Sequence, residues 1–393
     1  MSQESGKSPP VPAIGFGPNA GGKFSQENYH HPAAGWGAAN SVTRVLIKQG
    51  ELIDGARVVL KMNHEDGGFD CPGCAWPDDR HGLHLDICEN GIKHSTWEMT
   101  KKRVGREFFA AHTVTELMGW TDFALEDAGR LTEPMRYDAA SDKYVPISWE
   151  DAFELAGAQF RNLASPDEAA FYTSGRLGNE ATFLYQLFAR EFGTNNLPDC
   201  SNMCHEASGR ALAAAIGTGK GTVDITDWDR ADLLIVMGVN ASSNAPRLLT
   251  SLAKSFRRGA QVVHVNPLIE AASTRTIVPH EMLDMALFRS TRIGTMNVQP
   301  RIAGDLALMR GVAKHLLEAA ETNPEAVDQN FLDRFTSGFE SYRKLVAATS
   351  WEEIELQSGV SEAEIRKLGE LSSFPGASAS PSRSTPWIPC GKS

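Results

Sequence analysis

The sequence has little of what would place the protein in a membrane, on nucleic acid or among disulfide-rich folds. None of its apolar runs approaches the roughly 20 residues that a membrane-spanning helix needs. Its six cysteines in 393 residues are too few to hold a fold of this length together by disulfides. Basic residues are outnumbered, 38 against 49 acidic ones, and the resulting charge of −11 repels phosphate backbones. We therefore expect no membrane segment and no nucleic acid partner.

Targeting signals are also missing from the N-terminus. We find no signal peptide, and the first arginine is Arg44, so a twin-arginine signal is missing too. These observations predict a cytoplasmic protein whose thiols are reduced and free to bind metal. Hydrophobic residues make up 41% of the chain, enough for a sizeable buried core, and the length suggests two to three domains.

Composition divides the chain into five stretches. Residues 1–40 are rich in glycine and proline and predict a flexible arm. Residues 41–130 begin with a pattern that predicts one short helix and a strand, and then gather cysteine and histidine among Gly, Asp and Pro. Residues 131–197 and 198–371 have the regular patterns of α/β structure. Residues 372–393 are rich in serine and proline, and we interpret them as an aberrant or disordered tail. A truncated or aberrant C-terminus is favoured over a natural disordered tail.

The regular part predicts a parallel sheet covered by helices. Asp232–Val239 and Gln261–Val265 are nearly continuous apolar runs, typical of strands buried on both faces. A helix over Pro246–Arg258, ended by Gly259, connects them into a βαβ unit, hence a doubly wound α/β fold.

Helices are also expected outside this unit. One begins at the capping residue Ser148, and others cover Asp305–Glu321 and Ser361–Leu371. A further helix begins at Asn179, and its apolar residues recur at the spacing of a core-facing stripe: Leu184, Leu187, Phe188 and Phe192.

A cysteine motif in the second stretch predicts a metal site. Cys71-Pro72-Gly73-Cys74 puts two thiols on one tight turn, and Cys88 follows after thirteen residues. Three soft ligands in this arrangement suit Zn²⁺, with His81 or His84 as the fourth ligand, or an iron–sulfur cluster. The spacing alone leaves both open and makes a thioredoxin-like redox pair the weaker reading, because Pro77 opposes the helix that such a pair needs.

Two further groups of residues are candidates for binding and catalysis. Cys204 and His205 are neighbours, and the imidazole could lower the pKa of the thiol or accept a proton. On these residues alone, a helix start with one buried cysteine is the favoured interpretation. Polar residues and turn formers follow the two buried strands, at Gly238, Asn240, Asn244, Asn266 and Pro267. Strand carboxyl ends are where open α/β sheets bind nucleotides, and no GxGxxG fingerprint points to NAD. Their amides suit a guanine edge or a ribose, and turn formation is an equally good reading.

Several long motifs taken together resemble one enzyme family. They are FDCPGCAWPD at 69–78, DICENGIK at 86–93, YTSGRLGNEATFLYQLFAREFGTNN at 172–196 and PDCSNMCHE at 198–206. In this order they are similar to the alpha subunit of formate-dehydrogenase-like molybdopterin oxidoreductases. The similarity runs from about Ser41 to Leu371 and corresponds to roughly the N-terminal half of that family.

The resemblance implies the cofactors and the roles of the candidate residues. It implies a molybdenum or tungsten centre held by two molybdopterin guanine dinucleotides, with a [4Fe-4S] cluster bound by the segment 41–130. Cys71, Cys74 and Cys88 match cluster ligands, and Lys93 falls near a lysine between cluster and pterin. The remaining matches are Cys204 as metal ligand, His205 as proton acceptor, and Gly238, Asn240, Asn244, Asn266 and Pro267 along the guanine dinucleotide.

On this resemblance the reaction is a two-electron oxidation of formate or a similar small molecule, with an electron-transfer protein as partner. The chain departs from the family in two ways. It has no fourth cysteine near Cys71, Cys74 and Cys88. The family's C-terminal half, including its barrel-like domain, is expected beyond Leu371 and is not found there. We therefore expect the chain as written to be inactive. The alternative hypothesis is a non-catalytic, zinc-binding interaction module.

Overall fold

The computed structural model divides into two compact units that alternate along the sequence. It describes residues 31–64, 67–71, 73, 74, 76, 87–173, 177–198, 203 and 205–373. Of the described residues, the first unit takes those within 99–208, and the second takes those within 31–98 and 209–373. The first unit is therefore inserted into the sequence of the second. The domain boundaries expected from composition stay a prediction.

The first unit contains short strand pairs and mostly short helices. β2 (Arg103–Val104) pairs with β3 (Arg130–Leu131) in parallel, and β4 (Met135–Asp138) with β5 (Lys143–Pro146) antiparallel. Its helices are α4 (Arg106–Ala111), α5 (Val114–Met118), α6 (Asp122–Ala128), α7 (Trp149–Arg161), the 3-10 turn η1 (Pro166–Glu168) and α8 (Asn179–Phe192), followed by α10 (Glu206–Ile216), which begins in this unit. The predicted cap of α7 is confirmed, because the Ser148 hydroxyl accepts a hydrogen bond from the backbone of Asp151 at 3.0 Å.

The predicted core stripe of α8 is largely exposed. Leu184, Leu187 and Phe188 are 62%, 52% and 48% exposed, so the expectation that this stripe is buried was wrong for them. The rings of Phe188 and Phe192 nevertheless lie 5.9 and 5.1 Å from the ring of Phe160. An amphipathic pattern marks an apolar face, and what covers that face is decided by the rest of the chain.

The second unit begins with helices that precede the cysteine motif. β1 (Ala33–Ala34) leads into α1 (Gly35–Gln49), α2 (Leu52–Lys61) and, after the cysteine motif, α3 (Glu89–Glu98). The strand expected at the start of the stretch 41–130 is wrong, since α1 and α2 together cover residues 41–60 except for a short connection. Gly55 of α2 lies so close to Leu46 that a Cβ there would be 2.3 Å from its side chain, and glycine thus lets α1 and α2 approach closely.

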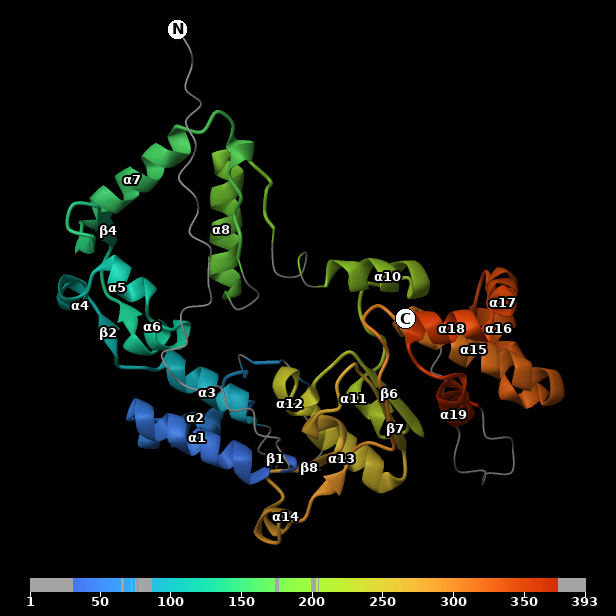
Figure 1. The fold of residues 1–393 in the computed structure, drawn as a ribbon. Coiled ribbons are helices and arrows are strands. Elements are labelled where there is room, and N and C mark those ends of the chain that lie inside the picture. Colours follow the sequence, from blue (N-terminus) through green and yellow to red (C-terminus); the bar gives the residue numbers. More distant parts are fainter. Residues whose placement is uncertain are drawn as a thin grey trace. The chain divides into compact units, whose positions relative to one another are not determined.

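A parallel sheet forms the centre of the second unit, in the order β10–β7–β6 (Figure 1). β6 (Leu233–Met237) and β7 (Gln261–Val265) lie within the two predicted strands, and β10 (Met296–Val298) extends the sheet beyond them. α13 (Leu248–Arg258) connects β6 to β7 and ends at Gly259, whose φ is +103°. The predicted α/β class with a parallel sheet is confirmed.

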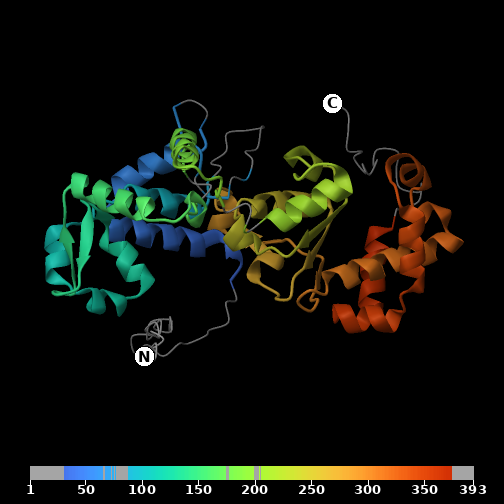
Figure 2. The ribbon, with the colours of Figure 1, turned by 90° about the horizontal axis from the view of Figure 1, so that it is seen from above.

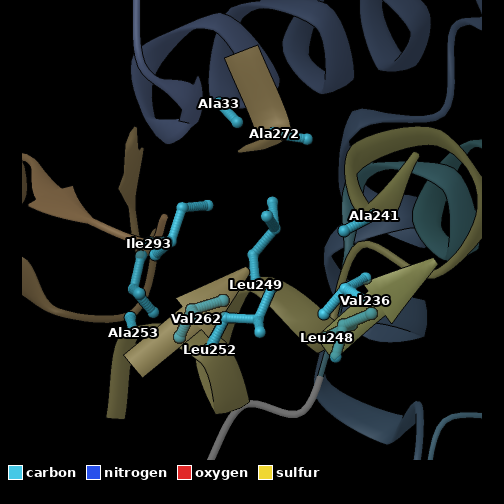
Figure 3. Close-up of a cluster of buried hydrophobic side chains, with 11 residues drawn as sticks. Ala33, Val236, Ala241, Leu248, Leu249, Leu252, Ala253, Val262, Ala272 and Ile293 are labelled. Carbon is cyan, nitrogen blue, oxygen red and sulfur yellow. The ribbon is translucent and has the colours of Figure 1, made fainter. Parts of the chain in front are cut away.

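Apolar side chains cover both faces of this sheet. On one face Val236 and Val262 pack with α13 residues such as Leu252 (Figure 3). On the other face Val263 and Val265 pack against α15 (Asp305–Thr322), α18 (Trp351–Ser358) and α19 (Glu362–Ser372). The alternation along β7 sends successive valines to opposite cores, as period-two geometry requires.

The remaining elements complete the second unit. α16 (Gln329–Phe335) and α17 (Phe339–Ala348) join α15, α18 and α19 in the helical part coloured orange to red (Figure 2). A second small sheet has the order β1–β8–β9, with β8 (Arg275–Ile277) and β9 (Thr291–Arg292). The shorter elements are α11 (Ile225–Trp228), α12 (Ala241–Asn244), η2 (Ala271–Ser273), α14 (Met282–Ala286) and η3 (Pro324–Ala326). Of the helices described, none has the length and apolar character needed to cross a bilayer.

Candidate functional site

The cysteine motif begins in a turn that follows α2. The backbone N–H of Cys71 donates to the Asn63 side-chain oxygen at 2.7 Å, and the N–H of Gly73 donates to the Cys71 sulfur at 3.4 Å. Asn63 itself has φ +58°, a left-handed conformation that asparagine tolerates better than most residues. The turn is thus held by its own backbone, with the Cys71 thiol accepting one of its hydrogen bonds.

Cys88 lies at the N-terminus of α3. Its sulfur accepts a hydrogen bond from the backbone N–H of Gly91 at 3.3 Å, and its carbonyl accepts one from Ile92 at 3.1 Å. The hydrogen bond from the Gly91 N–H and the helix dipole at this position both act in favour of the thiolate. Cys88 therefore occupies a position that suits a metal-binding sulfur.

Gly91 brings the thiols together. A Cβ at Gly91 would lie 2.5 Å from the Cys71 sulfur and 3.7 Å from the Cys88 sulfur, so both sulfurs lie around the space that glycine leaves open. We call Cys71, Cys74 and Cys88 the thiol site. All three are half-buried. The Cys71 and Cys88 sulfurs lie beside Gly91, and Cys74 is near enough for its charge to act on Cys88. Their role as metal ligands stays a prediction.

The electrostatics of the thiol site follow from this crowding. A hydrogen bond with Cys71, followed by burial, raises the pKa of the Cys88 thiol above its usual range, and the charge of Cys74 adds to the effect. A bound cation would reverse that balance, because it stabilises the thiolates. Within the ranges that the structure describes, no three His, Cys, Asp or Glu side chains stand in the arrangement of an assembled metal site.

The thiol site supplies some, but not all, of the ligands that either metal group suggested by the sequence requires. Three thiols supply three of the four positions around zinc, and three corners of a four-iron cluster. His81 and His84 lie outside the described residues. Lys93, expected between cluster and pterin, forms an ion pair with Glu89 one turn earlier on α3.

The polar residues after the buried strands lie at one edge of the sheet, which we call the strand-end edge. It follows from the parallel pairing of β6, β7 and β10, whose carboxyl ends point the same way. Gly238 has φ +65° there, and the Asn240 side chain accepts hydrogen bonds from the backbone N–H groups of Ser242 and Ser243. Asn240 therefore caps α12, as its turn-forming interpretation predicts, and Asn244 is the last residue of that helix.

The same edge includes a residue that the sequence did not single out. Gln299 follows β10 directly, and its side-chain amide donates to the carbonyl oxygen of Pro267 at 2.8 Å. The neighbouring backbone N–H of Asn266 donates to the carbonyl of Val298 at 3.0 Å. The sequence did carry a signal, since Gln299-Pro300 repeats after β10 the amide-proline pair that Asn266-Pro267 forms after β7.

Cys204 lies outside the described residues. His205 is exposed and directly precedes α10. Both positions belong to the unit that contains residues 99–208, whereas the thiol site and the strand-end edge belong to the other unit. The roles predicted for Cys204 and His205 therefore stay predictions.

Comparison with known proteins identifies relatives of the chain. Residues 130–310 match the family model of the molybdopterin oxidoreductases. Protein YdeP of Escherichia coli is 45% identical over 349 residues, which cover 88% of this chain and 46% of YdeP. The uncharacterized oxidoreductase Rv2900c of Mycobacterium tuberculosis is 43% identical, covering 84% and 42%. Formate dehydrogenase H of Escherichia coli is 28% identical, covering 62% and 31%. The chain spans about half the length of the first two relatives.

Proposed function

Because residues 130–310 make up a molybdopterin oxidoreductase domain, we propose that the chain serves a two-electron oxidation of a small molecule such as formate. Family membership supports an enzyme and a molybdenum–pterin cofactor. The finer assignments are ours: two guanine dinucleotides on the metal, a [4Fe-4S] cluster, and formate or a similar substrate.

The approach of the Cys71 and Cys88 sulfurs beside Gly91, with Cys74 near enough to act on Cys88, is the observation that carries this proposal. Cys71, Cys74 and Cys88 would hold the cluster, which would supply one-electron transfer to a partner protein. A short distance along the same unit, Gly238, Asn240, Asn244, Asn266 and Pro267 would bind the guanine dinucleotide at the strand-end edge.

The chemistry assigned to this chain's own residues is binding and proton transfer. The Cys204 sulfur would bind the molybdenum or tungsten, and the His205 imidazole would accept the substrate proton, which a neutral imidazole does near pH 7. Lys93, which pairs with Glu89 on α3, would lie between the cluster and the pterin. A bound molybdenum–pterin would supply a two-electron acceptor for the substrate.

Metal analysis of the purified chain tests the proposal. We expect iron, labile sulfide and molybdenum or tungsten. Cys88→Ser should lose iron, whereas Cys204→Ser should lose molybdenum and retain iron. Zinc alone in the wild-type protein would overturn the proposal and favour the zinc-binding module, which would use the same three thiols as ligands.

A dye-reduction assay tests the substrate. Formate-dependent reduction by protein that contains stoichiometric molybdenum would support formate. Protein that contains molybdenum and fails to oxidise formate would redirect the assignment to another small molecule.

A further inference from the structure

One short stretch of the second unit contacts both arms of the thiol site. The first arm is the turn that contains Cys71 and Cys74, and it continues to Trp76. The guanidinium of Arg247 donates to the carbonyl oxygen of Trp76 at 2.6 Å, and Arg247 is only 7% exposed. The Trp76 ring packs edge-on against Trp228, with ring centroids 5.5 Å apart. The first arm is thus attached to the α/β core two residues after Cys74.

The second arm is attached to the same stretch. Asn90 lies two residues after Cys88, and its side-chain amide donates to the carbonyl oxygen of Ser243 at 2.9 Å. Ser243 and Arg247 are four residues apart, at the end of α12 and at the start of α13. We call residues 243–247 the anchor stretch. The two arms are thus attached to neighbouring points of one short stretch.

We propose that Arg247 and Asn90 are positioning residues for the thiol site: they set the separation of the Cys74 arm from the Cys88 arm without binding the metal. The inference rests on the proposed function, since it assumes that these thiols bind metal. A metal site requires ligand distances within about 0.2 Å, and a loop that is not held in place must be ordered when the metal binds. Removing either attachment transfers that ordering cost to the binding step.

The charged contact should matter more than the neutral one. A hydrogen bond from a charged guanidinium in a buried place is stronger than one between neutral groups. Arg247 is almost fully buried, whereas Asn90 is half-buried. Loss of the Arg247 contact should therefore weaken metal binding more than loss of the Asn90 contact.

Cobalt(II) titration of the reduced, metal-free full chain tests the proposal, with the sulfur-to-cobalt charge-transfer absorption as the signal. We expect Arg247→Met to weaken Co²⁺ binding about tenfold, equal to about 1.4 kcal/mol, and to reduce the absorption per bound ion. Arg247→Lys keeps a donor and should recover most of the affinity. Asn90→Leu should weaken binding by about threefold to fivefold.

Arg301→Met is the control. The Arg301 guanidinium also donates to a backbone carbonyl oxygen in the second unit, that of Leu356 at 3.0 Å, and this contact involves neither arm of the thiol site. We expect Arg301→Met to lower the unfolding midpoint and to leave Co²⁺ affinity unchanged. This control separates positioning of the thiols from general loss of stability.

Three results would overturn the inference. If Arg247→Met and Asn90→Leu both retain wild-type Co²⁺ affinity and absorption, the positioning roles are wrong, although the thiol site stands. Equal loss of Co²⁺ affinity in Arg301→Met would reduce the effect to a general loss of stability. Failure of the wild-type chain to give thiolate absorption with Co²⁺ removes the thiol site itself, and the metal proposal with it.

Discussion

Replacing Gly91 by alanine would place a methyl group among the sulfurs of the thiol site. The added Cβ would lie 2.5 Å from the Cys71 sulfur and 3.2 Å from the Met62 sulfur. Non-bonded atoms attract at about 3.5–4.0 Å, so the Cys71 sulfur must move by roughly 1 Å. That movement exceeds the tolerance of about 0.2 Å for a metal–ligand distance. We therefore expect Gly91→Ala to weaken Co²⁺ binding by more than about tenfold, or more than about 1.4 kcal/mol.

The effect on folding should be much smaller than the effect on metal binding. Alanine is favoured over glycine inside a helix by about 1 kcal/mol, and forcing an extra carbon into a packed site costs about 1–3 kcal/mol. The two terms offset each other in part, so the free energy of unfolding should fall by no more than about 2 kcal/mol. Urea denaturation of the metal-free chain measures this change, alongside the Co²⁺ titration.

Gly209→Ala in α10 is the control for helix propensity. The nearest atom to a Cβ there is a backbone oxygen at 3.9 Å, so the methyl group meets open space. We expect Gly209→Ala to stabilise the chain by up to about 1 kcal/mol and to bind Co²⁺ like the wild type. If Gly91→Ala behaves in the same way, the reasoning about the crowded thiol site is refuted.

Three further predictions concern the second unit. Gly311→Ala would bring a Cβ within 2.9 Å of isoleucines in α18 and α19 and should lower the free energy of unfolding by about 1–3 kcal/mol, measured in urea; an unchanged midpoint would contradict the close packing. Leu308→Ala empties a fully buried position of α15 and should cost about 2–5 kcal/mol in the same assay. Burial lowers the pKa of His264, against a smaller opposing effect of its hydrogen bond to a backbone carbonyl. The unfolded chain then binds the proton first, so stability should fall as the pH drops below about 6.5. His264→Gln should show a flatter dependence of the unfolding midpoint on pH between 7.5 and 5, and equal slopes would refute this role.

The sequence predicted the central βαβ unit well because its signals are local. The bounds predicted for Gln261–Val265 agree with β7, since a strand buried on both faces is a continuous apolar run. The end of α13 agrees as well, because Gly259 takes the left-handed conformation that ends helices. β10 was missed because Met296–Val298 is too short for a periodic pattern to stand out, and Gln299 was missed with it.

The sequence predicted which cysteines form the thiol site but did not predict how they are arranged. Spacing selected Cys71, Cys74 and Cys88, but the open space at Gly91 depends on how α3 packs beside the turn. The contact of Arg247 with Trp76 joins residues 171 positions apart, and no local pattern encodes it. Such contacts arise from tertiary structure, which single-sequence patterns do not carry.

The insertion of residues 99–208 into the second unit has a consequence for synthesis on the ribosome. β1 pairs with β8, so Ala33 cannot form its strand pairing until Thr276 has been synthesised. At about 5–20 residues per second, that delay is roughly 12–50 s. During it, the newly made thiols emerge without the anchor stretch that later holds their two arms. On the proposed metal role of these thiols, their two arms would be held in place only once residues 243–247 have left the exit tunnel, so the timing of cofactor delivery would depend on the synthesis of that stretch.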